Sequence, residues 1–205
     1  MNRLKLLAAA GTLAVTVTLA GCGLGGGGHD MGSMSSPSSS TGPTSSAAAS
    51  PAAGPHDDAD VMFAQMMIPH HRQAIEMADM IVAKHAIDSE VSTLATQIKA
   101  AQAPEIDQMT GWLTGWGQSA SSMPMDHDMG GTMSRSDMDA LDKATGDEAA
   151  KLFLSGMVKH HQGAIDMAED ELANGQSSDA KKLAQSIKDS QQVEIDKMNE
   201  LIKKY

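Results

Sequence analysis

The chain has 205 residues, a length that fits one domain with appendages. Its net charge of −11 argues against a nucleic-acid partner, because nucleic-acid binding requires a basic surface. Aromatic residues make up only 2% of the chain, whereas 17 residues are methionine. A core of Ala, Leu, Ile and Met favours helices, since these side chains lose little rotamer freedom there. The acidic surface serves solubility and also suits a protein that handles cations.

Residues 1–21 have the features of a bacterial lipoprotein signal peptide. Arg3 and Lys5 precede an apolar run over residues 6–20, which is short for a membrane-spanning helix. The run ends in Leu-Ala-Gly-Cys, which resembles the lipobox, whose cysteine becomes the lipidated first residue. Cys22 is the only cysteine of the chain, so it cannot form an intramolecular disulfide. We expect lipidation at Cys22 and anchoring on the extracytoplasmic face of a bacterial cell membrane; a plain secretory signal is the alternative.

Residues 22–55 are rich in Gly, Ser, Ala and Pro and bury too little apolar surface to fold, so we expect a flexible linker behind the lipid anchor. From residue 56 onward, the apolar residues recur with a helical period. The sequence therefore predicts one folded domain over residues 56–205.

This domain contains a duplication. The stretch at residues 63–79 recurs at residues 153–169, at a constant offset of 90 positions. The identical pairs are Phe63/Phe153, Met67/Met157, His70/His160, His71/His161, Ala74/Ala164, Ile75/Ile165, Met77/Met167 and Ala78/Ala168. A second, shorter match at an offset of 89 pairs Gln102 with Gln191 and Glu105 with Glu194.

The periodicity predicts four long helices, with a short helix at 136–144 between the second and the third. The long helices cover about 57–85, 147–173 and 178–204, and the second runs from about 89 and frays between 111 and 117. Long helices with short links inside each half indicate an all-α, up-down-up-down four-helix bundle of the ferritin-like kind, made of two duplicated helical hairpins. In that order the first and third long helices are parallel, diagonal partners.

Histidine and glutamate occupy the inner stripe of these helices. We expect His70, His160, Glu105 and Glu194 to converge in the middle of the bundle, with His71 at the edge of the stripe. Burying a carboxylate is costly unless it is paired. Three interpretations remain open: a His–Glu hydrogen-bond network that fixes helix register, a metal site, or a site of proton transfer.

The residue types near the histidines indicate which metal the site would bind, iron or copper. Ferritin-like di-iron bundles use Glu-x-x-His motifs, and this sequence has none. Methionine stands three residues before the first histidine in both repeats, as Met67 and Met157. Sulfur beside imidazole selects Cu(I) or Ag(I) over iron and magnesium. The alternative is that both methionines only fill the core.

A loop at residues 118–134 is rich in methionine and has no apparent core to join. Because methionine is oxidisable in an exposed loop, we interpret this segment as capturing metal. Its candidate ligands are Met123, Met125, His127, Met129 and Met133, and Met138 follows shortly after.

The spacing Phe-x3-Met-x2-His-His-x2-Ala-Ile-x-Met, followed by Gln-x2-Glu-Ile-Asp-x-Met, resembles a bacterial family catalogued as domain of unknown function 305. The resemblance covers residues 60–205. It implies a secreted or membrane-anchored four-helix bundle, and some Met- and His-rich members of the family are periplasmic copper-binding proteins. The positions it implicates are His70, His71, His160, His161, Met67, Met77, Met157 and Met167.

We therefore expect a cell-envelope lipoprotein that binds copper as Cu(I), and also silver, for buffering, chaperoning or resistance. The alternative is a non-catalytic structural or partner-binding bundle in which the histidines and glutamates form a core network. We expect no enzymatic activity, because no nucleophile–base pair or phosphate loop is visible.

Overall fold

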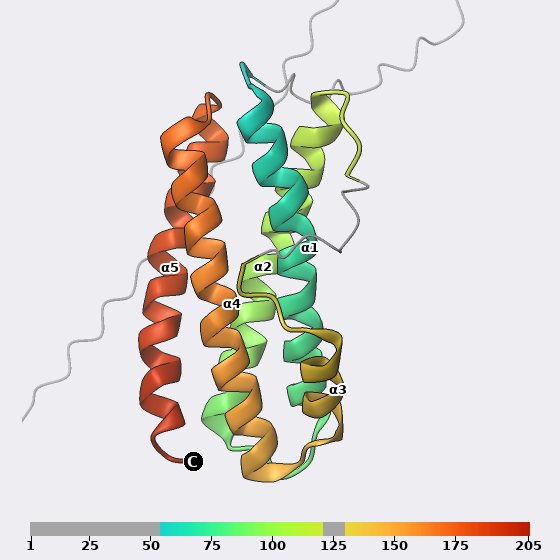
Figure 1. The fold of residues 1–205 in the computed structure, drawn as a ribbon, viewed down its shortest axis with the longest axis vertical. Coiled ribbons are helices and arrows are strands. Elements are labelled where there is room, and N and C mark those ends of the chain that lie inside the picture. Colours follow the sequence, from blue (N-terminus) through green and yellow to red (C-terminus); the bar gives the residue numbers. More distant parts are fainter. Residues whose placement is uncertain (1–53, 121–129) are drawn as a thin grey trace, which may run out of the picture. The chain divides into compact units, whose positions relative to one another are not determined.

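The computed structural model describes residues 54–120 and 130–205, and this part of the chain is helical without any strand. Its helices are α1 (Asp58–Ala83), α2 (Ser89–Gly115), α3 (Arg135–Lys143), α4 (Gly146–Asn174) and α5 (Ser178–Ile202) (Figure 1). The bounds of α1, α3, α4 and α5 lie within about two residues of their predicted positions, and α2 ends inside the range where we expected it to fray. The prediction of an all-α bundle is thus confirmed. None of the helices in the described ranges has the length and apolar character needed to span a bilayer.

Side-chain caps explain where the helices begin. Asp57 caps α1 through the backbone amides of Ala59 and Asp60, and the Asp60 side chain accepts from the Asp57 amide in return. Asp88, Ser134 and Ser177 accept from backbone amides at the starts of α2, α3 and α5. Each cap satisfies amides that a helix leaves without an internal partner.

The long helices pair as the hairpins α1–α2 and α4–α5, and the hairpins are joined mainly through α1 and α4. The start of α1 lies beside the end of α4, since Asp60 accepts from the amides of Gln176 and Ser177. At the other end, Lys204 after α5 forms an ion pair with Glu90 at the start of α2. Helices α1 and α4 are therefore adjacent and antiparallel (Figure 1), whereas we expected the first and third long helices to be parallel and diagonal.

The connection between the two hairpins explains this difference. Near the start of α1, the Gln65 side chain donates to the carbonyl of Ser119. Just beyond the end of α1, Lys84 donates to the carbonyl of Asp142 in α3. Ser119 and Asp142 therefore lie at opposite ends of α1, so α4 begins at the end where α1 stops. The up-down-up-down order that we expected would have started α4 at the end of the bundle where α2 stops.

The buried apolar side chains form two clusters. One surrounds Phe153, Leu154 and Ile81, and the other surrounds Phe63 and Ile187. Along α1, Met67 belongs to the Phe63 cluster and Met77 to the Phe153 cluster. Along α4, Met157 belongs to the Phe153 cluster and Ala164 to the Phe63 cluster. The two His-His pairs lie between these positions and thus mark the boundary between the clusters.

Two methionines that we assigned to an exposed, metal-capturing segment belong to this core. Met133 packs against the Phe153 cluster, and Met138 is 9% exposed within it. Helix α3 brings Met138 and Leu141 to the same cluster, which the loop-like composition of the preceding residues hid. The expectation that these two residues lack a core was therefore wrong.

A pair of carboxyl groups joins α1 to the end of α4. Burial alone would raise the pKa of Asp60, but hydrogen bonds from the amides of Asp57, Ser177 and Gln176 outweigh it and hold that pKa below its usual value. Glu171 is almost completely buried beside Asp60. Burial, together with the neighbouring Asp60 carboxylate, raises the pKa of Glu171 to about 8. Glu171 is therefore protonated in the folded protein at neutral pH.

This arrangement predicts that Glu171→Gln is more stable than the parent, and that the difference in stability grows as pH rises. The unfolded chain releases the Glu171 proton above its ordinary pKa of 4.5, whereas the folded chain retains it to about 8. The contribution of the Glu171 carboxyl group to the free energy of unfolding is therefore fully present below pH 4.5 and is lost as pH rises toward 8. Glutamine stays neutral throughout, so the Tm difference between variant and parent should grow from pH 5 to pH 8. The exposed Glu76→Gln is the control; a difference that does not change with pH would contradict the assignment.

Candidate functional site

The two His-His pairs lie at the middle of α1 and α4. Because these helices pack antiparallel, the centre of one faces the centre of the other, and His70 comes against His160. Their ring centroids are 3.7 Å apart, and their planes are inclined by 41°. His70, His71, His160 and His161 are all fully buried. We call these four side chains the histidine layer.

The second histidine of each pair bonds to a glutamate of its own hairpin. His71 Nε2 donates to Glu105 Oε2 over 2.8 Å, joining α1 to α2. His161 Nε2 donates to Glu194 Oε2 over 2.6 Å, joining α4 to α5. Both glutamates are partly exposed, with 18% and 20% of their side chains accessible. Each carboxylate therefore reaches water on one side and a buried imidazole on the other.

The structure brings the predicted histidines and glutamates together, but not in the expected combination. Consecutive residues on a helix point about 100° apart. One histidine of each pair therefore faces the opposite hairpin, and the other faces its own hairpin partner. We expected Glu105 and Glu194 to meet His70 and His160; they meet His71 and His161 instead. Within the described ranges, no three His, Cys, Asp or Glu side chains gather around one point as metal ligands would.

The facing histidines are neutral. Burial lowers the pKa of His70 to about 3, and the neighbouring His71 adds to the effect. Burial likewise lowers the pKa of His160 well below its usual value, with His70 as the next contribution. A neutral imidazole keeps one nitrogen lone pair, which is the form that binds metal ions.

The hydrogen bonds identify which lone pairs remain. His70 Nε2 donates to the carbonyl of Gly130 over 3.4 Å, and His71 and His161 donate from Nε2 to their glutamates. In the neutral ring of His70, Nδ1 therefore carries the lone pair. The Nδ1 atoms of His70, His71 and His161, and both ring nitrogens of His160, are buried without a hydrogen-bond partner among the described residues. Buried polar atoms without partners are costly, so this many at one level of the bundle points to a ligand.

Four methionines flank the histidine layer. Met67 and Met157, one turn before His70 and His160, are fully buried. Because α1 and α4 are antiparallel, these two lie on opposite sides of the layer, one in each apolar cluster. Met77 is also buried, in the Phe153 cluster, and Met167 is partly buried against the Phe63 cluster. Thioethers thus stand on both sides of the imidazoles.

The connection before α3 is fixed against the histidine layer, which we did not predict. A Cβ on Gly163 would collide with the carbonyl of Gly130, the same carbonyl that accepts from His70. The Gln73 side chain holds Met133 through both its backbone amide and its carbonyl. Gln73 and Gly163 occupy equivalent positions of the two repeats. Their difference was a usable signal, since a break in the repeat marks where each helix meets the connection.

The remaining predicted site residues lie outside the described part of the chain. These are the loop residues Met123, Met125, His127 and Met129, and the lipidation site Cys22. Their roles stay predictions.

The His–Glu pairs predict a measurable loss of stability. Glu105→Ala should leave His71 Nε2 buried without an acceptor, which costs about 1–3 kcal/mol of unfolding free energy. Asp107→Ala removes an exposed carboxylate two residues further along α2 and should change stability by no more than about 0.5 kcal/mol. The measurement is the urea midpoint of both variants. Equal midpoints for Glu105→Ala and the parent would show that the pair contributes nothing.

The sequence profile of the family described as domain of unknown function (DUF305) matches residues 60–202. No curated protein matches the chain. Among solved structures, a DUF305 protein from Streptomyces coelicolor, inferred to be secreted, is 32% identical, covers 71% of this chain and 91% of its own, and has a TM-score of 0.67. A DUF305 fragment from Deinococcus radiodurans is 28% identical over 74% of this chain and 99% of its own, with a TM-score of 0.68.

A third solved protein carries metal. The Cu(I)-bound form of CopM is 32% identical, covers 71% of this chain and 96% of its own, and has a TM-score of 0.60. The same protein has been solved with Cu(II) and with silver. The matched residues, the all-α bundle and the identity to these proteins agree, and the chain belongs to the DUF305 family.

Proposed function

We propose that this protein binds Cu(I) at the histidine layer, takes up silver by the same chemistry, and serves as a copper buffer or chaperone outside the cytoplasm. The observation that carries the proposal is the set of buried, unpartnered nitrogens in His70, His71, His160 and His161. Because His70 and His160 are neutral, neither ring has to lose a proton before its nitrogen lone pair binds a cation.

The donor set favours a soft cation. Imidazole nitrogens suit several transition metals, whereas thioethers select Cu(I) and its analogue Ag(I). His70 and His160 would supply nitrogen, and Met67 or Met157, one turn away on either side, would supply sulfur. Copper bound there would be held in reserve for release. That CopM, at 32% identity, binds Cu(I), Cu(II) and silver supports the same class of ligand for this chain.

The two glutamates have a supporting role in this proposal. Each fixes the orientation of the second histidine's ring by accepting a hydrogen bond from its Nε2. The same contacts would exist in a bundle that binds no metal, where they would only hold each hairpin together. That structural or partner-binding role is the alternative function, and the His–Glu distances favour it equally.

The location follows from the amino-terminal sequence and a relative. The Streptomyces coelicolor relative, inferred to be secreted, supports an extracytoplasmic place for this chain. We propose in addition that Cys22 is lipidated and tethers the bundle to the membrane through residues 22–55. Cys22→Ser should then abolish processing or release the protein from the membrane fraction. Identical fractionation of variant and parent would contradict lipid anchoring without affecting the copper proposal.

The copper proposal is tested on residues 54–205, which contain all five helices and both apolar clusters. The solved DUF305 fragment, 99% of which is covered by this chain, indicates that such a part folds alone. The parent, His70→Phe/His160→Phe and Met67→Leu/Met157→Leu are titrated with Cu(I) against a chromophoric chelator. The two core variants should lose the tightest equivalent. Replacing Met by Leu keeps the core volume, so a loss there reports the sulfur and not misfolding.

Two further variants complete the titration. His85→Gln removes an exposed histidine and should bind like the parent. Changing Met123, Met125 and Met129 to Leu should remove weaker equivalents only, because these thioethers do not belong to the histidine layer, whose buried donors are already placed by the packing of α1 and α4. If the parent binds no Cu(I), or if both core variants keep the tightest equivalent, the histidine layer is structural and the proposal fails.

A further inference from the structure

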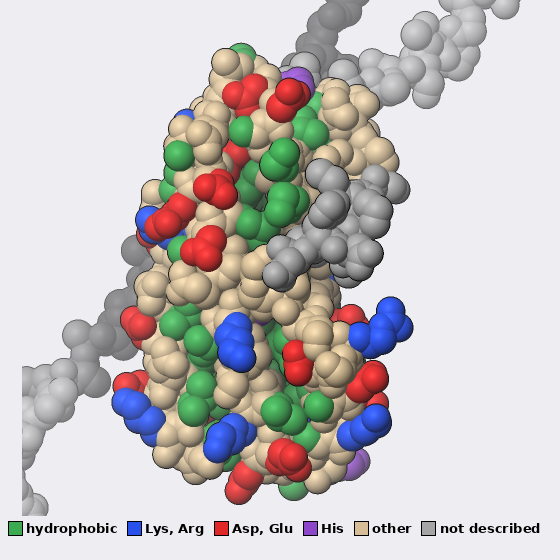
Figure 2. Space-filling view, viewed as in Figure 1, with side chains coloured by type: hydrophobic (Ala, Val, Ile, Leu, Met, Phe, Trp, Pro, Cys, Tyr) green, Lys and Arg blue, Asp and Glu red, His purple; other side chains and the backbone are tan. Residues whose placement is uncertain are grey.

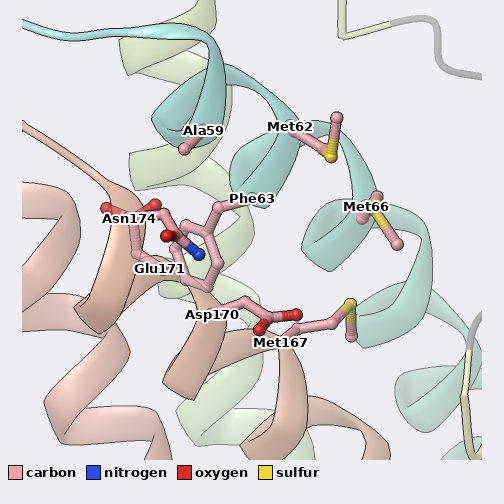
Figure 3. A pocket seen from close by; sticks show the side chains of 8 residues that line it. All are labelled: Ala59, Met62, Phe63, Met66, Met167, Asp170, Glu171 and Asn174. Atoms are coloured by element: carbon pink, nitrogen blue, oxygen red, sulfur yellow. The ribbon is translucent and has the colours of Figure 1, made fainter.

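A pocket of about 250 Å³ lies between α1 and α4, toward the start of α1 and away from the histidine layer. Met62 and Met66 of α1 and Met167 of α4 line it, together with the acidic side chains Asp170 and Glu171. In Figure 3 the three thioether ends follow one another on one side of the pocket, and the Asp170 carboxylate lies next to Met167. Met62 is 50% exposed, so the pocket is open to water.

The duplication shows that this concentration of sulfur belongs to one end of the bundle. At the offset of 90, Met62 corresponds to Leu152 and Met66 to Gly156, whereas Met77 corresponds to Met167. The equivalent place at the other end therefore has Met77 beside Leu152 and Gly156. There Gly156 makes room for the sulfur of Met133, which comes from the connection. At the Gly156 end, the second methionine is Met133, which precedes α3. At the other end, α1 carries Met62 and Met66, and the space beside them is an open pocket.

The chemistry of this open place is that of a soft-cation site. Met62 is exposed and Met66 is half-buried, so both thioethers can be oxidised, and two methionines where the other repeat has Leu and Gly require a use. Three thioethers from two helices offer sulfur ligands, and sulfur ligands select Cu(I) or Ag(I) over Mg²⁺ and Ca²⁺. Figure 2 shows hydrophobic side chains along α1 and α4 bordered by acidic ones in the upper half of the molecule, where Lys and Arg are sparse. An acidic border attracts cations.

We propose that Met62, Met66 and Met167 form a second, solvent-accessible site for a soft monovalent cation, with Asp170 as the nearby charge. The inference rests on the proposed copper function for its choice of cation, but it concerns a different place. Consecutive residues on α1 relate the two places: Met66 lines the outer pocket, and Met67 is buried beside the histidine layer. A cation at the outer site remains exchangeable with solvent, whereas one at the inner site is enclosed.

Silver and methyl NMR test this inference. Residues 54–205 are labelled with ¹³C in the methionine methyl groups and titrated with Ag(I), which is not oxidised or reduced during the experiment. The signals of Met62, Met66 and Met167, assigned by single Met→Leu substitutions, should shift together and saturate. They should do so equally in His70→Phe/His160→Phe, because the outer site does not use the histidines.

Two variants sharpen the result. Met62→Leu/Met66→Leu should abolish the shift at Met167 and leave the changes at Met67 and Met157 intact. Met80→Leu, on α1 but packed against the Phe153 cluster, is the matched control and should change nothing at the pocket.

The contrary results distinguish a failure of this inference from a failure of the proposed copper function. If Ag(I) shifts Met67 and Met157 but none of the three pocket signals, the pocket is an apolar surface for a protein partner and the inference fails while the copper function stands. If the pocket signals stop responding in His70→Phe/His160→Phe, the pocket is not a separate site and the inference also fails. If no methionine signal responds, both the inference and the proposed function are wrong.

Discussion

The structure depends on burying four imidazoles where α1 crosses α4. At that level apolar packing is interrupted, so the hairpins are held by contacts that only these side chains make: His70 against His160 between hairpins, and one His–Glu hydrogen bond inside each hairpin. Burial keeps the two facing rings neutral. Neutral rings cost less to bury in a low-dielectric core than charged ones, and they leave nitrogen lone pairs available to a cation. Stability and metal binding therefore depend on the same atoms.

The two ends of the bundle are equivalent by duplication but differ in chemistry. At one end, the connection and α3 pack Met133 and Met138 into the Phe153 cluster. At the other, the protonated Glu171 and the ionised Asp60 join α1 to the end of α4, and a sulfur-lined pocket opens beside them. Differences between the repeats at Gln73/Gly163 and Met66/Gly156 create this asymmetry. The duplicated positions therefore build the layer, and the positions that diverged determine how each end is closed.

Local sequence signals sufficed for the helices, because caps and a strong 3.6-residue period define them independently of tertiary packing. The meeting of the two His-His motifs also followed from the duplication, since a motif at the centre of each helix meets its copy whether the helices run parallel or antiparallel. Which histidine meets which glutamate did not follow, because it depends on which face of α1 packs against α4, and that face changes with the direction of α4. That direction is fixed by the contacts of Gln65, Gln73 and Lys84 with the connection, which carry no periodic signal.

The most direct test of the central claim is to locate copper in the folded protein. Crystals of residues 54–205 loaded with Cu(I) would give an anomalous difference map at the copper absorption edge. We predict a peak in the histidine layer, within bonding distance of a ring nitrogen of His70 or His160 and of a sulfur from Met67 or Met157. A copper-loaded crystal whose anomalous peaks all lie at the connection or on the surface, with none in the histidine layer, would contradict this account.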